Sequence, residues 1–394
     1  MFIVKKIIAP ILIVVFSVFL VLGVGGCKPA APAETAAETE AATTATATET
    51  AAAEQWELPD GTKYTPKTND YGFEPVPNDK VLVGDIIIVT QHEFQIRQRA
   101  AFQQYVEQQG VKVLQDAGEF NPERQRQVLE SFVAQGVQAV NFYGLDPATA
   151  KAQTTYLADN GIFSVLQWED FETVTYPWPV ASVITSDNNA ATGGAYAAKW
   201  FEEKYGKDAK AMGGIIVQAQ FRNAMMRSEL FKKGFEEVHA NVEWVEAEGQ
   251  GSRDPARVAG EALVRANPDI QVGFGINDDS TLGFMAALEA AGKTPDNFCL
   301  IGFDGTIASY DAIKRGTILM ADVAQDPEAA GFNGAVVAVQ IARGEKAFGD
   351  FPRNLLVNVC QLVTLDNMDP FYEKASAAVE LIKGLPTTTT TTTK

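Results

Sequence analysis

Residues 121–143 read NPERQRQVLESFVAQGVQAVNFY, and this stretch contains one complete unit of the predicted fold. Asn121 is a favourable helix N-cap, Pro122 suits the first helical position, and Gly136 is a typical helix stop. The apolar run VQAVNFY that follows has the length of a buried strand. A capped helix followed at once by such a strand predicts a helix that packs on a parallel sheet.

The same arrangement recurs along the chain. Another helix is predicted from about Phe94 to Gln109, and Asp-Pro pairs open further helical stretches at Asp146, Asp254, Asp326 and Asp369. The other strand-like runs are DIIIVT, VKVLQ, IFSVLQW, VASVIT, GGIIVQA, QVGFGI, CLIGFD and TILMADVA. This alternation predicts an α/β fold of parallel βαβ units with right-handed crossovers. Because the runs are too many for one sheet, we predict two doubly wound, Rossmann-like lobes.

The composition predicts how the chain divides around these lobes. Residues 27–55 are rich in Ala, Thr and Glu and predict a disordered linker, and residues 386–394 form a poly-Thr disordered tail. Residues 56–79 are an N-terminal extension. Lobe 1 is expected to comprise residues 80–186 and 326–355, and lobe 2 residues 187–325 and 356–385. A hinge of three crossover strands, near residues 185–187, 323–325 and 355–357, would join them.

The N-terminus has the layout of a secretory signal peptide, residues 1–26. Lys5 and Lys6 precede an apolar stretch, and VGGC ends at Cys27. This string resembles a lipobox, which implies cleavage before Cys27, acylation of its thiol and attachment to a membrane by lipid, at a cell surface or in a periplasm. An uncleaved signal anchor is the alternative.

Charge and cysteine content narrow the class of protein. A net charge of −18 argues against nucleic acid or an anionic membrane surface as a direct partner. Cys299 and Cys360 lie in apolar runs and are expected to be buried free thiols, with a disulfide as the alternative. The chain has two histidines and neither a C-x-x-C nor an H-E-x-x-H motif, so no metal site and no cofactor are expected.

The run CLIGFDGT, residues 299–306, ends a predicted strand on Asp304 and turns at Gly305. In doubly wound sheets, ligands bind beyond the carboxyl ends of the strands. The segments that follow the other strand-like runs are also rich in polar and aromatic residues. We therefore expect the side chains after these runs to surround a ligand.

The second half of the chain contains the strings FGINDDSTLGFMAALEAAGK, IGFDGT and ADVAQDPEAAG. Their order and spacing resemble type I periplasmic sugar-binding proteins of ABC transporters, the family of ribose, galactose and xylose binders. With SDNNAATGGAYAAKWF and GFEEV, the resemblance covers about Val83 to Leu365. It implies that Asn277, Asp304 and Gln325 hydrogen-bond the hydroxyl groups of a sugar. Carboxylates and amides suit such a neutral ligand, and aromatic rings cover its C–H faces.

This sequence departs from the family pattern in lobe 1. The loop TQHEFQ is shorter than the usual Asn-x-Phe-Phe loop, so Phe94 is expected to stack on the ligand with His92 or Gln91 as its polar partner. After IFSVL, the usual Asp-Arg pair is replaced by QWED, which places Trp168 and Glu169 there.

Further candidates follow from the same comparison. The arginine position of the family falls on Phe231, and Arg227 lies one turn earlier on the same helix face. Phe221 or Trp168 could supply an aromatic face that is missing from GQGSRD, and Tyr143 could reach the cleft.

Purely structural roles remain open for several of these residues. Asp304 and Asn277 could be helix caps, and Trp168 could be a packing residue. Arg97 and Arg99 are most simply explained as a solvated helix face.

The leading hypothesis is a monomeric, lipid-anchored protein that binds a small neutral sugar or polyol between its lobes and delivers it to an ABC importer permease. The alternative is an extracellular sensor that presents its ligand to a membrane receptor kinase or chemoreceptor. An enzyme, such as a glycoside hydrolase with Glu169 and Asp304 as paired acids, is a third class. No catalytic motif supports it, so we expect no enzyme activity.

Overall fold

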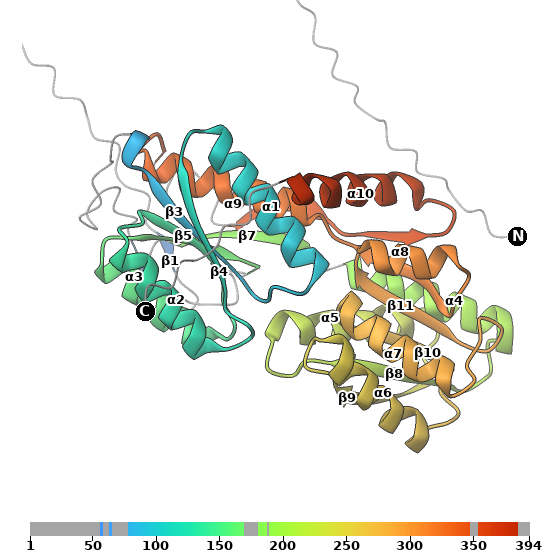
Figure 1. Ribbon diagram of the computed structural model, residues 1–394. Helices are drawn as coiled ribbons and strands as arrows, with labels where there is room; N and C mark the ends of the chain where they lie inside the picture. Colours follow the sequence, from blue (N-terminus) through green and yellow to red (C-terminus); the bar gives the residue numbers. More distant parts are fainter. Residues whose placement is uncertain are drawn as a thin grey trace, which may run out of the picture. The chain divides into compact units, whose positions relative to one another are not determined.

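The computed structural model describes residues 56–57, 63–64, 78–168, 180–186, 189–346 and 354–384. These residues form two six-stranded sheets with helices on both faces of each, which confirms the predicted α/β class with two parallel-sheet lobes (Figure 1). A two-stranded antiparallel pair, β1 (Trp56–Glu57) and β2 (Lys63–Tyr64), and a short 3-10 helix, η1 (Asn78–Lys80), precede the first sheet. Cys27, residues 27–55 and the poly-Thr tail lie outside the described residues.

The sheet of lobe 1 is parallel throughout and has the strand order β13-β7-β6-β5-β3-β4. Its strands are β3 (Leu82–Ile87), β4 (Lys112–Ala117), β5 (Ala139–Tyr143), β6 (Phe163–Gln167), β7 (Val180–Ser186) and β13 (Asn354–Val359). Helices α1 (Glu93–Gln108) and α9 (Pro327–Ala342) cover one face of this sheet, and α2 (Pro122–Ala134) and α3 (Pro147–Asp159) cover the other.

Strand β5 shows why the strand-like runs of lobe 1 are mostly apolar. Ala139 packs in the core beneath α1 and α9, whereas Val140 and Phe142 pack in the core beneath α2 and α3. Because neighbouring side chains point to opposite faces and both faces are covered, nearly every position is buried.

The sheet of lobe 2 has the order β14-β12-β11-β10-β8-β9 and is parallel except for the edge strand β14. Its strands are β8 (Ala211–Val217), β9 (Val242–Glu248), β10 (Val272–Gly275), β11 (Cys299–Asp304), β12 (Leu319–Ala324) and β14 (Gln361–Thr364). Strand β9 was absent from the predicted runs because VEWVEAE alternates apolar and acidic residues at the edge of the sheet.

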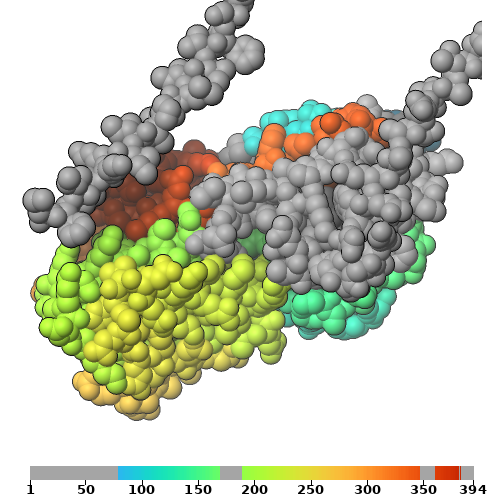
Figure 2. Space-filling model, turned by 180° about the vertical axis from the view of Figure 1, so that it is seen from behind, coloured from blue at the N-terminus to red at the C-terminus, as the bar shows by residue number. Residues whose placement is uncertain are grey.

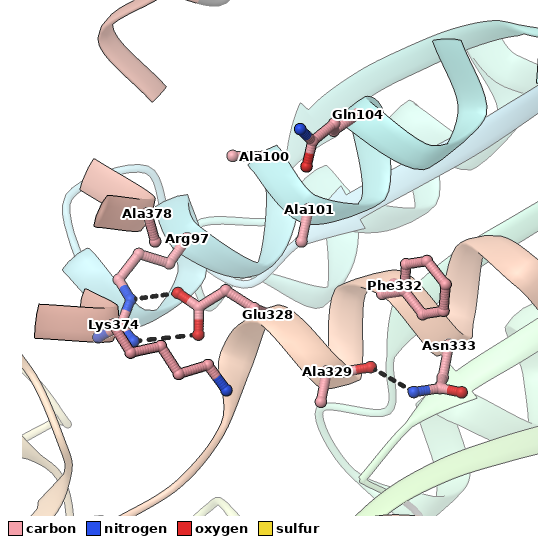
Figure 3. Close-up of a pocket in the computed structure, with 10 residues that line it drawn as sticks. All are labelled: Arg97, Ala100, Ala101, Gln104, Glu328, Ala329, Phe332, Asn333, Lys374 and Ala378. Atoms are coloured by element: carbon pink, nitrogen blue, oxygen red, sulfur yellow. Dashed lines mark hydrogen bonds and ion pairs between the residues drawn. The ribbon is translucent and has the colours of Figure 1, made fainter. Parts of the chain in front are cut away.

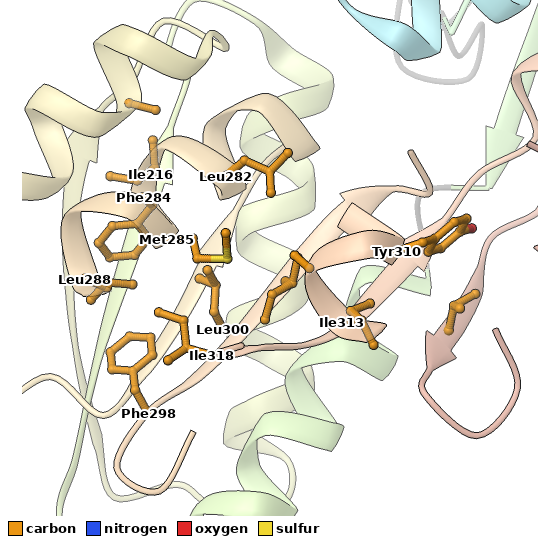
Figure 4. Packing of buried hydrophobic residues seen from close by; sticks show 14 of the residues in the cluster. Ile216, Leu282, Phe284, Met285, Leu288, Phe298, Leu300, Tyr310, Ile313 and Ile318 are labelled. Atoms are coloured by element: carbon orange, nitrogen blue, oxygen red, sulfur yellow. The ribbon is translucent and has the colours of Figure 1, made fainter. Parts of the chain in front are cut away.

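Helices cover both faces of the second sheet. Helices α4 (Ala190–Tyr205) and α5 (Arg222–Glu236) pack on one face, and α6 (Arg253–Ala266), α7 (Asp278–Ala290) and α8 (Ile307–Lys314) pack on the other. The core beneath α6, α7 and α8 includes Phe284, Leu300 and Ile313 (Figure 4). The final helix, α10 (Asp369–Gly384), adds Ala375 to this core. Seen from the opposite side, the lime-green to yellow residues of lobe 2 form one continuous surface (Figure 2).

The chain passes from one sheet to the other three times. It leaves lobe 1 after β7, returns after β12 to form α9, and leaves again between β13 and β14. The boundary expected after residue 355 falls inside β13, so the last change of sheet comes at Cys360 instead.

Most of the predicted helix starts are confirmed. The side chains of Asn121, Asp146 and Asp326 accept hydrogen bonds from the backbone of the first helical turn. Helix α6 differs, because it begins at Arg253 and Asp254 lies within its first turn. Cys299 and Cys360 are buried and are not joined in a disulfide, as predicted.

Within the described parts of the chain, none of the helices combines the length and apolarity needed to cross a membrane.

Helices α4 and α5 approach each other closely at two glycines. A Cβ on Gly194 would overlap the backbone carbonyl of Phe231, and a Cβ on Gly234 would overlap the carbonyl of Ala191. Neither obstacle is a flexible side chain that could rotate away. The helices can therefore keep this separation only if both positions lack a side chain.

We expect Gly194→Ala to lower the free energy of unfolding by about 1–3 kcal/mol, because the added methyl group forces the two helices apart. Urea denaturation measures the change. Lys199→Ala, at an exposed position of the same helix, should change stability by less than about 0.5 kcal/mol. Equal stability of the two variants would contradict the tight helix contact.

Candidate functional site

A small cavity lies where the carboxyl ends of strands from both sheets meet, and we call it the cleft cavity. Its volume is about 40 Å³, room for roughly three water molecules. It is lined by Ile88, His92, Phe94, Gln95, Phe120, Trp168, Gln218, Phe221, Ala224, Arg227, Ile276, Asn277 and Asp304. Both lobes contribute to the wall, as the rule for doubly wound sheets predicts.

Seven of the residues selected from the sequence line this cavity. They are His92, Phe94, Trp168, Phe221, Arg227, Asn277 and Asp304. Gln91, Tyr143 and Gln325 are not part of its lining. Glu169 lies outside the described residues.

The three residues outside the lining have other surroundings. Gln91 is exposed to solvent. Tyr143 is buried behind Trp168, and its hydroxyl group is held by Gln95 and Gln98. Gln325 donates from Nε2 to Oδ1 of Asp304 over 2.8 Å, and it lines a separate cavity of about 170 Å³. Gln325 therefore supports a cavity residue instead of facing the cleft cavity itself.

Asp304 does not cap the helix that follows it. Thr306 is the N-cap of α8, and its side chain accepts from the backbone N–H of Ser309. The carboxylate of Asp304 is buried and lines the cleft cavity. Its φ of 144° lies in a region that only glycine adopts easily. This strained backbone indicates that the position of the carboxylate is maintained for a purpose other than capping.

Arg227 is the charged partner of Asp304 across the cavity wall. Its Nη1 lies 3.6 Å from Oδ1 of Asp304 and donates to the carbonyl of Ile276 over 3.0 Å. The guanidinium group lies over the rings of Phe303 and Trp168, at 4.2 and 5.2 Å from their centroids. Burial raises the pKa of Asp304 well above its ordinary value, and the positive charge of Arg227 opposes this shift.

Asn277 is both a cap and a cavity residue. Its side-chain oxygen accepts from the N–H of Ser280, and its Nδ2 donates to the carbonyl of Gly251 over 2.9 Å. The capping alternative is therefore correct for Asn277, although an amide has a further donor and acceptor site that could face the cavity.

The lobe 1 side of the cavity is mainly aromatic. Phe94 and Trp168 meet edge to face with ring centroids 5.0 Å apart, and Phe120 lines the wall beside them. Trp168 has a φ of 66°, directly after the end of β6. Its indole nitrogen is buried and has no hydrogen-bond partner among the described residues. An unpartnered N–H of this kind is suited to an acceptor group on a ligand.

His92 marks the edge of the cavity. Its Nε2 lies 3.5 Å from Oδ2 of Asp279 in lobe 2. Burial lowers the pKa of His92, and the carboxylate of Asp279 opposes this effect. The imidazole is therefore neutral near pH 7, where it can both donate and accept a hydrogen bond.

Sequence reasoning missed six lining residues. They are Ile88, Gln95, Phe120, Gln218, Ala224 and Ile276. Gln218 and Ile276 directly follow β8 and β10. The sequence analysis placed both inside the predicted runs GGIIVQA and QVGFGI, so shorter runs could have identified them. Gln95 could not be found this way, because it faces inward from a helix and bonds the N–H of Ile88 and the hydroxyl group of Tyr143.

A second pair of acids lies beneath Asp304. Oδ1 of Asp278 and Oδ2 of Asp322 are buried, and neither accepts from an N–H or O–H group in the described structure. A Cβ on Gly302 would lie 2.9 Å from the first oxygen and 2.5 Å from the second, so both crowd against the same backbone atom. Burial, followed by the charge of Asp278, raises the pKa of Asp322 well above its ordinary value. Asp322 therefore binds a proton more readily in the folded protein than in the unfolded chain.

No group of three or more His, Cys, Asp or Glu side chains is placed to hold a metal ion in the parts of the chain that the structure describes.

Comparison with known proteins assigns the chain to a family. The family model of the periplasmic binding protein domain matches residues 83–346. The chain belongs to this family. The resemblance that the sequence motifs indicated is thereby confirmed for the type I sugar-binding class.

Curated relatives are ribose and apiose binders. The ribose import binding protein of Salmonella typhimurium is 33% identical over 184 residues, which are 46% of this chain and 59% of that protein. The ribose import binding protein of Bacillus subtilis is 25% identical over 268 residues, 67% of this chain and 82% of that protein. The match to the Salmonella protein thus spans about three fifths of its length.

Solved structures of solute-binding proteins share the fold. One from Bacillus halodurans, with bound myo-inositol, has a TM-score of 0.65 at 23% identity and covers 76% of this chain and 99% of that chain. The myo-inositol binding protein of Caulobacter has a TM-score of 0.64 at 22% identity. The alignment covers 78% of this chain and 100% of that chain.

The buried acid pair gives a prediction for the pH dependence of stability. The folded protein binds a proton at Asp322 more tightly than the unfolded chain does, so the free energy of unfolding falls as pH rises from about 4 toward the raised pKa. Asp322→Asn, which imitates the protonated acid, removes this contribution. The variant should gain stability relative to the wild type as pH increases, by about 1.4 kcal/mol for each unit of pKa difference that is removed.

Urea denaturation of both proteins at pH 5 and pH 7.5 measures the effect. Titrating groups outside the cluster of Asp278, Asp304 and Asp322, such as Asp85, whose pKa burial raises to about 6, contribute equally to both proteins and cancel. A variant that loses stability relative to the wild type between pH 5 and pH 7.5 would contradict the raised pKa of Asp322.

Proposed function

We propose that this chain is an extracytoplasmic lipoprotein that binds a small neutral sugar, a monosaccharide or polyol, in the cleft cavity and delivers it to the permease of an ABC importer. The observation that carries the proposal is the composition of the cavity wall. Asp304, Arg227 and Asn277 from lobe 2 face Phe94 and Trp168 from lobe 1.

The two sides of the wall suit different surfaces of a sugar. A carboxylate, a guanidinium group and an amide bind hydroxyl groups through directed hydrogen bonds. Aromatic rings cover the C–H faces of the same molecule. A neutral ligand also leaves the Arg227–Asp304 pair intact, whereas a charged ligand would have to compete with one of its members.

The size of the cavity indicates how a ligand would reach it. A volume of about 40 Å³ is too small for a monosaccharide. The lobes would therefore have to separate before a sugar enters, or Trp168 would have to move aside. Three crossovers join the lobes, and a hinge of this kind allows one lobe to rotate against the other.

The relatives support a sugar as the class of ligand. The Salmonella and Bacillus relatives are named as ribose import binding proteins. A relative from Paraburkholderia graminis, 31% identical over 166 residues, is named as a D-apiose import binding protein. The aligned structures include two with bound myo-inositol. Their ligands are uncharged and rich in hydroxyl groups, like the molecule that the wall of the cavity would accommodate.

The lipid anchor at Cys27 is supported by the sequence alone. Residues 27–55 would then be a stalk that holds a monomeric two-lobed body away from the membrane, within reach of the permease.

A thermal-shift screen of the purified protein tests the proposed function. A cognate ligand raises the melting temperature by mass action, and the rise grows with ligand concentration. The panel contains pentoses, hexoses, inositols and, as non-sugar comparisons, nucleosides and amino acids. Stabilisation by a non-sugar alone, or by no compound of the panel, would contradict a sugar-binding function.

Asp304→Ala should weaken the binding of the sugar identified in this screen by about 1.5–3 kcal/mol, the usual contribution of a hydrogen bond to a charged group. This corresponds to roughly 10- to 150-fold in the dissociation constant measured by calorimetry. Asp296→Ala, which removes a carboxylate that is 97% exposed, should leave the affinity unchanged. Wild-type affinity in the Asp304 variant would remove this residue from the site.

A further inference from the structure

Two charged residues of α1 contact lobe 2 without lining the cleft cavity. Both oxygens of the Glu93 carboxylate accept from the backbone N–H of Ile307, over 2.9 and 3.1 Å. Nη1 of Arg97 donates to the carbonyl of Gly305 over 2.9 Å. Both contacts reach the segment 304–307, which we call the Asp304 turn.

The two side chains are also bound to each other and to α9. Arg97 is 3% exposed and donates from Nε and Nη2 to the two carboxylate oxygens of Glu328, over 2.6 and 3.1 Å. This fork lies beside a pocket of about 340 Å³ that α10 also lines (Figure 3). Nη1 of Arg97 is 3.4 Å from Oε1 of Glu93. The expectation that Arg97 belongs to a solvated face is therefore wrong.

The contact of Glu93 is favourable on electrostatic grounds. Ile307 is the first residue of α8, where backbone N–H groups are unpaired and the helix dipole is positive. A carboxylate at this point satisfies an orphan donor and interacts with the dipole. The N–H belongs to lobe 2 and the carboxylate to lobe 1, so this interaction exists only when the lobes are close together.

The Asp304 turn is held firmly within lobe 2. The N–H of Gly305 donates to Asp322 over 3.0 Å, and the N–H and hydroxyl groups of Thr306 donate to Asp278 over 2.8 and 2.7 Å. Gln325 binds the carboxylate of Asp304 itself. A force applied to this turn is therefore transmitted to the body of lobe 2, and not absorbed by a flexible loop.

We propose that Glu93 and Arg97 are positioning residues that hold the lobes closed by binding the backbone of the Asp304 turn. They favour the closed arrangement without touching the ligand. Because a ligand that bridges both lobes binds best to the closed form, each contribution to closure also raises the apparent affinity.

The energetic balance keeps this interaction reversible. When the lobes separate, Arg97 retains Glu328 and Glu93 as partners within lobe 1. Among the groups bound to Glu93 and Arg97, the carbonyl of Gly305 and the N–H of Ile307 lose their partners, and water can replace both. Breaking these contacts then costs the net energy of two or three hydrogen bonds, and not the energy of an unpaired buried charge.

Hydrogen exchange of the full-length protein, measured by mass spectrometry without added ligand, tests the proposal. In Glu93→Ala, we expect about tenfold faster exchange at the Asp304 turn, the factor for one lost charge-assisted hydrogen bond. The same acceleration should occur at residues 118–121 and 218–224, which flank the cleft cavity from either lobe and contain no hydrogen-bond partner of Glu93 or Arg97. Faster exchange at these distant segments indicates opening of the lobes, which a local structural role would not produce.

Two further variants keep the test decisive. Glu93→Gln preserves the shape of the side chain and removes its charge, so hydrogen exchange at the same segments should accelerate less than in Glu93→Ala. This variant provides the test even if the alanine variant folds poorly. Arg97→Lys retains one donor and should behave in the same way. Glu123→Ala, at an exposed carboxylate paired with Arg126 in α2, is the matched control and should exchange like the wild type.

Acceleration confined to residues 304–307, or no acceleration at all, would overturn the proposal. The measurement uses no sugar, so its outcome is independent of the ligand that the cleft cavity binds.

Discussion

The site depends on one constrained piece of backbone, the turn at the end of β11. Asp304 leaves the sheet with a positive φ and is followed by Gly305, so the chain reverses before α8 begins. The carboxyl groups of Asp278 and Asp322 bind the two N–H groups that the turn exposes. Gln325 binds the carboxylate of Asp304 itself. The side chains of Asp278, Asp322 and Gln325 thus converge on this turn within lobe 2, so that the carboxylate of Asp304 can face the cleft cavity. Burying several acids is costly, and their raised pKa values are the direct sign of that cost.

The fold could be predicted from the sequence because its signals are local. The N-caps at Asn121 and Asp146 and the apolar strands between helices depend only on neighbouring residues. Strand β9 was missed because an edge strand buries only one face and its acidic residues break the apolar run. The position of the cavity followed from the topology alone, since the carboxyl ends of parallel strands meet at one edge of a sheet.

The roles of individual site residues were harder to predict because they depend on contacts between distant parts of the chain. Gln325 binds Asp304 and so supports the site from behind, although the resemblance to sugar-binding proteins implied that it contacts the ligand directly. Arg97 looks like an exposed residue of an amphipathic helix, but its partners, Gly305 and Glu328, lie more than 200 positions away. Nothing in the sequence near Arg97 indicates that lobe 2 will cover it.

The three crossings between the sheets also affect how the molecule can be made. Strands β13 and β14 are neighbours in the chain, separated only by Cys360, yet each completes the edge of a different sheet. Neither lobe is therefore a continuous piece of sequence, and neither sheet is complete until residues 354–364 have been synthesised. A nascent chain that already contains every other strand still lacks one edge of each sheet, so the two lobes can reach their final folds only at about the same point of synthesis.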